Sequence, residues 1–310
     1  MTDKIKILYV AGRGRSGSTI LDNILGQLEG FFSAGELRNI TPIGLIENRL
    51  CGCGVPFSEC GLWSDILGES FGNGGPPVNA DLVRLLGRYP RISDTPLFFL
   101  PGSDSITKAV FADYLHNLER LYRGILKQTG CKVIVDSSKF PPYGRLLELI
   151  PSVDLYVVHL VRDARAVAYS WLRKQRLPSG NSKEYMRQEN SFRSSLSWDL
   201  WNVMAELFWK SNPDRYIMMR YEDFIERPQQ SLHRILKLVD EERPDLPLLA
   251  DRKVQLKINH TVAGNPSRFR TGVVDLRANY DWKLKMHKSD VKIVTAMSWP
   301  LLYRYGYLET

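Results

Sequence analysis

The sequence predicts an α/β fold with three layers, in which a central parallel sheet lies between helices. Short apolar runs typical of buried strands alternate with stretches of helical periodicity along the chain. Residues 155–161 are almost continuously apolar, which is typical of a parallel strand covered on both faces. Residues 5–10 form a second such run, and a glycine-rich turn separates it from the next helical stretch. These three observations place the chain among the α/β proteins.

The first half of the chain supplies one strand, two helical regions and an insertion. After the strand at 5–10, apolar residues recur at three- and four-residue spacing over 18–28, which predicts a helix. Residues 40–105 contain many glycine and proline residues, so they predict an insertion of loops and short helices. A helical run covers 105–130, and Gly130 is the kind of residue that ends a helix.

The second half of the chain continues the alternation of strand and helix. Apolar runs predict strands at 132–136, 155–161 and 216–221. Helical patterns predict helices at 164–174, 192–209 and 228–239. Because strands and helices alternate, we expect right-handed crossovers between parallel strands. No linker or internal repeat divides the sequence, so we expect a single domain over residues 1–310.

The composition excludes several classes of function. The 42 lysine and arginine residues outnumber the 34 acidic residues and give a net charge of +8, but they are spread along the chain. Because no nucleic-acid-binding motif accompanies them, they favour an anionic small ligand over nucleic acid. The sequence has no run of about 18 apolar residues, so no membrane span is expected. Its first residues lack an apolar stretch before a cleavage site, which predicts a cytoplasmic protein without a signal peptide.

Three of the four cysteines lie close together in the sequence, at Cys51, Cys53 and Cys60, and the fourth is Cys131. Disulfides are uncommon in the cytosol, and structural zinc sites usually need two spaced pairs of Cys or His ligands. No second pair follows this segment, and the nearest downstream histidine is His116. We therefore predict reduced cysteines in a compact loop and no metal, with a disulfide and a metal site as the alternatives.

Residues 12–19 fit the phosphate-loop spacing G-x-x-x-x-G-K-[ST] except that Ser18 stands where the motif has lysine. Such a loop places backbone N–H groups around a phosphate at the start of a helix. The lysine normally reaches the β- and γ-phosphates of a nucleoside triphosphate, so its absence favours another 5′-phosphorylated nucleotide. The residues predicted to bind that phosphate are Gly14, Arg15, Ser16, Gly17, Ser18 and Thr19.

A second phosphate-binding pattern lies where the strand at 155–161 gives way to a helix. Arg162, at the end of that strand, can present its guanidinium fork to a phosphate. Ser170 follows about two helical turns later, so the two residues can share a ligand that lies along the helix. The alternative is a surface ion-pair helix in which Arg162 interacts with Asp163 and Arg165.

The loop and the Arg162–Ser170 spacing together resemble the sulfotransferase family, which uses 3′-phosphoadenosine-5′-phosphosulfate (PAPS). In this family, which has a P-loop-type fold, the first loop holds the 5′-phosphosulfate and the Arg…Ser pair holds the 3′-phosphate. Three later stretches are similar to family motifs: Y-E-D-F at 221–224, R-F-R-T-G at 268–272 and D-W-K at 281–283. The resemblance implies that Tyr221 lies near the adenine. It also implies that Arg268 and Arg270 belong to a loop that closes over the nucleotide and adds an arginine to the 3′-phosphate.

The sequence departs from the cytosolic phenol and steroid sulfotransferases at two places. Arg15 stands where those enzymes have a lysine in the first loop, and D-S-S-K at 136–139 replaces their K-T-H, which contains the base. The R-S-G-S-T loop and Glu36 after Gly35 are more similar to the tyrosylprotein and carbohydrate branch, where a glutamate after the first helix is the base. The C-G-C-G, D-S-S-K and G-N-P segments are similar to bacterial members of the family.

The resemblance implies catalytic roles for Arg15, Glu36 and Lys139. Arg15 is expected to meet the negative charge on the bridging oxygen as the nucleotide leaves, and Glu36 to accept the proton of the acceptor. Lys139 is expected to contact the sulfuryl oxygens. The residues expected to bind the acceptor are Glu36, Ser138 and Lys139. The alternatives are a salt bridge of Glu36 with a neighbour such as Arg38 and a surface position for Lys139.

Two histidines stand outside these motifs. His159 lies within a predicted strand, and a hydrogen-bonded core position is favoured there over a catalytic one. His260 precedes the C-terminal loop, and its position is consistent with a structural role and with a contact to the substrate.

We therefore predict a sulfotransferase that moves the sulfuryl group from PAPS to a hydroxyl or amine of a small-molecule or saccharide acceptor by in-line displacement, without a metal for the core chemistry. The insertion at 40–105 is expected to form the acceptor pocket, and residues 175–195 a mobile lid. The alternative is a P-loop small-molecule or nucleoside kinase that uses ATP, with Asp136 holding magnesium. The identity of the acceptor and the oligomeric state do not follow from the sequence.

Overall fold

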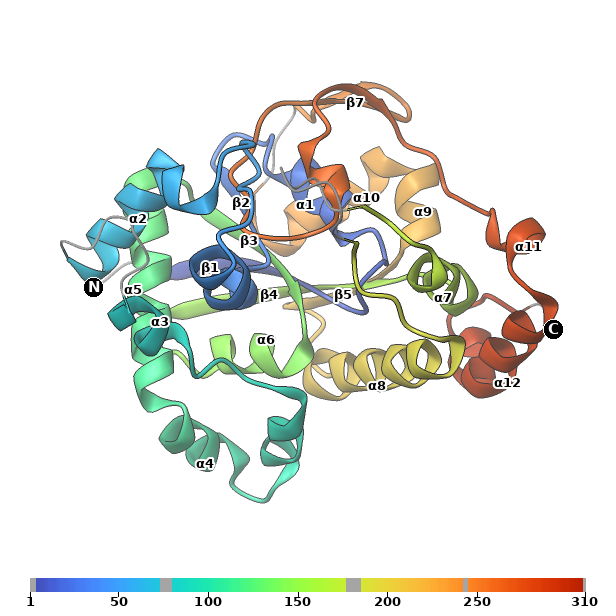
Figure 1. The fold of residues 1–310 in the computed structure, drawn as a ribbon, viewed down its shortest axis with the longest axis horizontal. Helices are drawn as coiled ribbons and strands as arrows, with labels where there is room; N and C mark the ends of the chain where they lie inside the picture. The colour runs from blue at the N-terminus through green and yellow to red at the C-terminus, as the bar shows by residue number, and fades with distance from the viewer. Residues whose placement is uncertain (1–3, 73–79, 177–184, 242–244, 309–310) are drawn as a thin grey trace. The chain divides into compact units, whose positions relative to one another are not determined.

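The computed structural model describes residues 4–72, 80–176, 185–241 and 245–308 (Figure 1). The chain forms two compact units. The first unit comprises Met1–Val10, Thr19–Tyr156 and Leu256–Thr271, and the second comprises Ala11–Ser18, Val157–Gln255 and Gly272–Thr310. Each unit is therefore built from segments that are far apart in the sequence. The expectation of a single domain stays a prediction.

The fold is α/β, as predicted, with a central parallel sheet of five strands in the order β2-β3-β1-β4-β5. The strands are β1 (Ile5–Ala11), β2 (Phe31–Gly35), β3 (Val133–Lys139), β4 (Val153–Val161) and β5 (Tyr216–Arg220). Within the first unit β2 pairs with β3, and within the second unit β4 pairs with β5, both in parallel. The four predicted strands are confirmed. β2 was not predicted because its sequence, F-F-S-A-G, is too short to show a strand period.

A smaller sheet of three strands was also not predicted. Its strands are β6 (Leu248–Ala250), β7 (Lys253–Leu256) and β8 (Gly272–Asp275), in that order. β6 and β7 pair in antiparallel fashion. Runs of three or four residues carry no clear period, so the sequence pattern alone does not reveal them.

The first unit contains a series of helices outside its strands, and several of them are short. The described part of the predicted insertion contains η2 (Ile40–Ile46), η3 (Phe57–Glu59), α2 (Gly61–Phe71), α3 (Ala80–Leu86) and η4 (Ile92–Phe99). The predicted helix at 105–130 is divided at Phe111 into α4 (Ser103–Val110) and α5 (Ala112–Thr129). Gly130 ends α5 at φ 63°, as predicted. The other helices of this unit are α1 (Ser18–Leu25), which begins one residue before it, η1 (Leu37–Asn39), α6 (Pro141–Glu148) and η5 (Pro266–Phe269).

Three helices form the core of the second unit. They are α7 (Ala164–Leu172), α8 (Ser191–Trp209) and α12 (Lys288–Arg304), and they pack against one another. Their buried side chains form one apolar cluster that includes Val167, Trp198 and Leu302. The remaining helices of this unit are α9 (Tyr221–Glu226), α10 (Pro228–Leu238) and α11 (Trp282–Lys285). None of the helices in the described ranges has the length and apolar character needed to cross a membrane.

His159 lies in the middle of β4 and is completely buried. The hydroxyl of Tyr216 donates to its Nδ1 at 2.8 Å, and its Nε2 donates to Oδ1 of Asn202 at 2.8 Å. Burial lowers the pKa of His159 to about 4, because the charged imidazolium would lose its hydration. The predicted role as a hydrogen-bonded core histidine is confirmed.

The lowered pKa of His159 predicts a loss of stability in acid. In the unfolded chain a histidine has a pKa of about 6.5, so unfolding takes up a proton between about pH 6.5 and about pH 4. The contribution of His159 to the free energy of unfolding is therefore complete above that window. It falls by up to about 3 kcal/mol as the pH drops through the window.

Urea unfolding of the wild type and of His159→Gln at neutral pH and near pH 4.5 measures this loss. Asp22 and Asp136 have raised pKa values that act in the opposite direction, but both proteins contain them. We expect the wild type to lose more stability on acidification than His159→Gln does. An equal loss in the two proteins would contradict the prediction.

Candidate functional site

The turn between β1 and α1 packs too closely on its neighbours to accept side chains at two glycines. Gly12 has φ 133°, and a Cβ there would lie 2.4 Å from the carbonyl oxygen of Leu160 in β4. Gly17 has φ 91°, and a Cβ there would lie 2.3 Å from the ring of Tyr221, the first residue of α9. Only glycine fits such positions without strain. Arg15 has φ 76°, a conformation that is uncommon for a residue with a side chain.

Oγ of Ser16, in this turn, and Nε of Arg162, directly after β4, are buried and lack a hydrogen-bond partner within the described ranges. A buried polar atom without a partner costs about 1–3 kcal/mol. Both residues belong to the second unit, and Nη1 of Arg162 donates to the carbonyl oxygen of Arg15 at 3.0 Å. The structure therefore brings the loop and Arg162 together, with donors left over for an anion.

Arg162 contacts the ring of Tyr221, whereas the ion pair at the start of α7 joins Asp163 and Arg165. Its guanidinium lies 4.6 Å from the centroid of the Tyr221 ring. The carboxylate of Asp163 instead accepts from Nη2 of Arg165 at 2.7 Å. The alternative of a surface ion-pair helix therefore describes Arg165 rather than Arg162. Ser170 lies half-buried farther along α7.

Trp171 in α7 holds the loop and two of its arginines. Its Nε1 donates to the carbonyl oxygen of Gly14 at 3.3 Å. The guanidinium groups of Arg13 and Arg15 lie 4.7 Å and 4.8 Å from its ring centroid. A cation over the face of an indole ring is attracted by the ring quadrupole. The contact with Trp171 restrains the guanidinium of Arg15.

Two residues of the segment 175–195, which is predicted as a lid, contact the arginines that pack on Trp171. Oε1 of Gln175 accepts from Nη1 of Arg15 at 2.7 Å. Glu189 pairs with Arg13, whose Nη2 lies 2.5 Å from the Glu189 carboxylate. Residues 177–184 of the predicted lid lie outside the described part of the chain, so the mobility of the lid stays a prediction.

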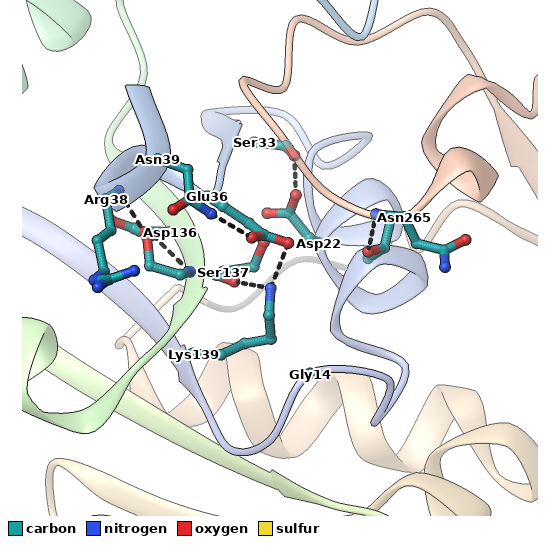
Figure 2. Close-up of polar contacts among 12 residues, drawn as sticks. Gly14, Asp22, Ser33, Glu36, Arg38, Asn39, Asp136, Ser137, Lys139 and Asn265 are labelled. Atoms are coloured by element: carbon teal, nitrogen blue, oxygen red, sulfur yellow. Dashed lines mark hydrogen bonds and ion pairs between the residues drawn. The ribbon is translucent and has the colours of Figure 1, made fainter. Parts of the chain in front are cut away.

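In the first unit, Glu36 and Lys139 form an ion pair at the carboxyl ends of two neighbouring parallel strands (Figure 2). Glu36 directly follows β2, and Lys139 is the last residue of β3. Nζ of Lys139 lies 2.6 Å from Oε1 of Glu36 and donates to the carbonyl oxygen of Ser137 at 2.7 Å. Nδ2 of Asn39 donates to Oε2 of Glu36 at 2.8 Å. Lys139 is buried, so the alternative of a surface lysine is wrong.

Asp136 is completely buried and accepts three hydrogen bonds. The backbone N and Oγ of Ser138 donate to its Oδ1 at 2.8 and 2.5 Å, and the hydroxyl of Tyr122 donates to its Oδ2 at 2.5 Å. Burial raises the pKa of Asp136 to about 6. Oγ of Ser138 also accepts from the backbone N of Arg38 at 3.0 Å. Asp136 therefore anchors the end of β3 and does not present an open carboxylate to magnesium, which weakens the kinase alternative.

The segment before η5 passes close to Thr19 and Glu36 within the first unit (Figure 2). The backbone N of Asn265 donates to Oγ1 of Thr19 at 3.3 Å. A Cβ on Gly264 would lie 3.7 Å from Oε1 of Glu36. The sequence indicates for the G-N-P segment only a similarity to bacterial members of the family. The structure shows that it lies beside the residue predicted as the base.

Arg268 is buried, whereas Arg270 is exposed. Nη1 of Arg268 donates to the carbonyl oxygen of Thr261 at 3.2 Å, and Nη2 donates to that of Leu50 at 2.5 Å. These bonds give Arg268 a role in holding the segment in place. The predicted contact of Arg268 and Arg270 with the nucleotide stays a prediction.

Asp22 is a buried carboxyl in α1 that sequence reasoning missed. Oγ of Ser33 donates to its Oδ2 at 2.7 Å (Figure 2). Burial raises the pKa of Asp22 to about 8, and the nearby carboxyl of Asp136 adds to this rise, so Asp22 carries a proton at neutral pH. The sequence feature that indicates this buried carboxyl is an acidic residue within the apolar stretch T-I-L-D-N-I-L of α1.

Comparison with known proteins identifies the family. The family model of the sulfotransferase domain matches residues 104–269, just over half of the chain. The chain belongs to the sulfotransferase family. This sulfotransferase is similar in structure to the sulfotransferase domain of the Synechococcus PCC 7002 olefin synthase, with 17% identity, 96% of each chain covered and a TM-score of 0.51. That likeness confirms the fold.

Another similar structure is the sulfotransferase domain from the curacin biosynthetic pathway. It is 16% identical, the match covers 96% of this chain and 99% of that chain, and the TM-score is 0.47. No curated protein matches the sulfotransferase significantly. Members of the family generally take the sulfuryl group from PAPS, so the predicted transfer of a sulfuryl group from PAPS is confirmed and the kinase alternative is not favoured. The relation to the tyrosylprotein and carbohydrate branch stays a prediction.

The packing of the turn predicts that Gly12→Ala is strongly destabilising. The new methyl group meets the backbone oxygen of Leu160, and the positive φ adds strain, so we expect a loss of about 2–4 kcal/mol in the free energy of unfolding. Gly61→Ala is the matched control, since a Cβ at Gly61 has no heavy atom within 4 Å among those described. Urea unfolding compares the two variants. Equal stability would contradict the close approach of the turn to β4.

Proposed function

We propose that this sulfotransferase binds PAPS through the loop at 14–19 and Arg162, and transfers the sulfuryl group to a hydroxyl or amine of a small-molecule or saccharide acceptor. The observation that carries the proposal is the pair of buried atoms without partners, Oγ of Ser16 and Nε of Arg162. A phosphate oxygen accepts hydrogen bonds from both groups. The same loop leads into the first turn of α1, where backbone N–H groups favour an anion.

The remaining residues of the proposed donor site follow the family resemblance. PAPS supplies an activated sulfuryl group, and adenosine 3′,5′-bisphosphate is the part that leaves. The backbone N–H groups and hydroxyls of residues 16–19 bind the 5′-phosphate, and Arg162 with Ser170 binds the 3′-phosphate. Support for Tyr221 near the adenine comes from its ring, which already lies beneath the Arg162 guanidinium. The residues proposed to close over the nucleotide are Arg268 and Arg270.

Arg15 is proposed to stabilise the negative charge that develops on the leaving oxygen. Its backbone is held in a left-handed conformation, and its guanidinium lies over Trp171 and donates to Gln175. A guanidinium that is already restrained loses little conformational entropy when it binds an anion. A fixed positive charge also stabilises developing negative charge without reorganisation, which is the usual source of catalysis by charged donors.

Glu36 is proposed as the group that accepts the proton of the acceptor. Hydrogen bonds from Lys139 and Asn39 hold one oxygen each of its carboxylate, so the side chain is fixed in position. A general base must lie within hydrogen-bond reach of the proton that it removes, and a fixed carboxylate meets this condition best. Nζ of Lys139 lies beside the same carboxylate and is proposed to contact the sulfuryl oxygens.

The insertion is proposed to form one wall of the acceptor pocket. Arg38 lies in η1, two residues after Glu36, and its guanidinium lies 5.2 Å from the ring centroid of Tyr89 and 4.6 Å from that of Phe140. Its Nη2 donates to the carbonyl oxygen of Pro90 at 2.8 Å. The contacts with Tyr89 and Pro90 bring this part of the insertion to η1, the element that follows the proposed base. A change in the insertion is therefore expected to alter the choice of acceptor.

Binding of adenosine 3′,5′-bisphosphate tests the donor site. We expect the wild type to bind it without added magnesium, as measured by isothermal titration calorimetry. Arg162→Ala is expected to weaken binding by roughly 10- to 100-fold, because it removes a charged hydrogen bond to phosphate. Arg193→Ala, at an exposed arginine of α8 in the same unit, is the matched control and should bind normally. Magnesium-dependent binding of ATP that survives Arg162→Ala would overturn the proposal.

Transfer of labelled sulfate from PAPS to a panel of hydroxylated small molecules and saccharides tests the role of Glu36. On any acceptor that the wild type labels, Glu36→Gln is expected to lower turnover by about 10²–10⁴-fold and to leave binding of adenosine 3′,5′-bisphosphate within about twofold. Glu47→Gln, at an exposed glutamate directly after η2, is the matched control. Unchanged turnover in Glu36→Gln would remove Glu36 as the base.

A further inference from the structure

Three cysteines and one histidine of the first unit meet at a single point. One ligand atom from each of Cys51, Cys53, Cys60 and His260 lies within 4.8 Å of the other three. The sequence predicts no metal here, because no second pair of ligands follows the cysteines and the nearest downstream histidine is His116. The fourth group comes instead from the C-terminal segment of the same unit, where His260 points its Nδ1 at two of the sulfur atoms.

We propose that these four side chains bind a structural zinc ion. Zinc binds thiolate sulfur at about 2.3 Å and imidazole nitrogen at about 2.0 Å in tetrahedral geometry, which separates two sulfur ligands by about 3.8 Å and a sulfur from a nitrogen by about 3.5 Å. Sγ of Cys53 lies 3.8 Å from Sγ of Cys60. Nδ1 of His260 lies 3.3 Å from Sγ of Cys60 and 4.0 Å from Sγ of Cys51. These three separations lie within about 0.5 Å of the tetrahedral values, and all four ligand atoms lie within 4.8 Å of one another, close enough to share one ion.

The backbone around the cysteines is held in the conformation that brings them together. The N–H of Gly54 donates to the carbonyl oxygen of Cys51, and the N–H of Cys51 donates to that of Val55, both at 2.8 Å. Nε1 of Trp63 donates to the carbonyl oxygen of His260 at 2.6 Å. Ligands that are fixed before the metal binds lose less entropy on binding it.

The cysteine loop and the histidine segment also pack directly on each other. The N–H of Gly52 donates to the carbonyl oxygen of Thr261 at 3.0 Å. A Cβ on Gly52 would lie 2.0 Å from Oδ1 of Asn259, so only glycine permits this approach. The residue between two of the cysteines therefore contacts both neighbours of His260. This packing makes the meeting of the four ligands a property of the fold.

Arg268 supplies a positive charge for the site. Three thiolates and one neutral imidazole around Zn²⁺ leave a net charge of −1, and a charge of this kind needs a partner when it is buried. Arg268 is buried and donates to the carbonyl oxygens of Leu50 and Thr261, which are the neighbours of Cys51 and His260. A cation thus lies at the point where the two ligand segments meet.

Zinc fits this set of ligands better than a disulfide or another metal. All four cysteines are free, and the distance of 3.8 Å between the Cys53 and Cys60 sulfur atoms is well beyond a disulfide bond. A tetrahedral set of three sulfurs and one nitrogen is typical of zinc. Four protein ligands leave no open position for water, which is typical of a structural zinc rather than a catalytic one. The metal would hold the cysteine loop to the segment that reaches Thr19.

Metal analysis of the purified full-length protein tests this proposal without any assay of sulfuryl transfer. We expect about one zinc per chain in the wild type and in Cys131→Ser, because Cys131 lies outside the cluster. Cys53→Ser removes a half-buried ligand and is expected to lower the zinc content to below a tenth and to lower the melting temperature. Cys53→His restores a ligand of the right type and should retain zinc.

Cobalt substitution gives a readout that does not depend on a variant that folds. The wild type reconstituted with Co²⁺ should show the intense visible absorption of tetrahedral cobalt and the near-ultraviolet band of cobalt–thiolate bonds, and zinc should displace both. A wild-type protein that contains no stoichiometric zinc and gives no thiolate band with Co²⁺ would overturn the proposal. Equal loss of zinc in Cys131→Ser and Cys53→Ser would also overturn it.

Discussion

The close approach of the β1–α1 turn to β4 and α9 is the constraint on which the proposed donor site depends. Without side chains at Gly12 and Gly17, the turn lies against the carbonyl oxygen of Leu160 and the ring of Tyr221. This contact places the carbonyl oxygen of Arg15 within reach of Arg162. The loop and the strand-end arginine are therefore parts of one rigid arrangement within the second unit. Rigid placement of donors is what allows a site to bind an anion without a large entropic cost.

A second constraint is the amount of negative charge that the first unit can bury. Glu36, Asp22 and Asp136 all lie near the carboxyl ends of β2 and β3, and three ionised carboxylates there would repel one another. The structure limits this repulsion in two ways. Lys139 pairs with Glu36, while burial raises the pKa values of Asp22 and Asp136 to about 8 and about 6. Glu36 is the carboxylate that keeps an ion pair, which agrees with its proposed role.

Most of the core sheet could be predicted from the sequence, but its edge strand β2 could not. The runs at 132–136, 155–161 and 216–221 are apolar enough to be recognised alone, whereas β2 and the strands of the smaller sheet are too short to show a period. The strand β2, which was not predicted, is important for the proposed site because Glu36 directly follows it. The pairing of β2 with β3 explains why Glu36 contacts Lys139. The sequence predicts a separate role for each of these residues and does not predict their contact.

The sequence by itself determined the local features of this protein. The spacing of Gly12 and Gly17, the arginine at a strand end and the apolar runs depend on backbone conformation over a few residues, so they can be read without the fold. Only the tertiary structure decided which distant residues meet, such as Glu36 with Lys139 and Cys60 with His260. Those contacts depend on strand order and on the path of the C-terminal segment. Both are set by the packing of the whole chain, and no spacing in the sequence encodes them.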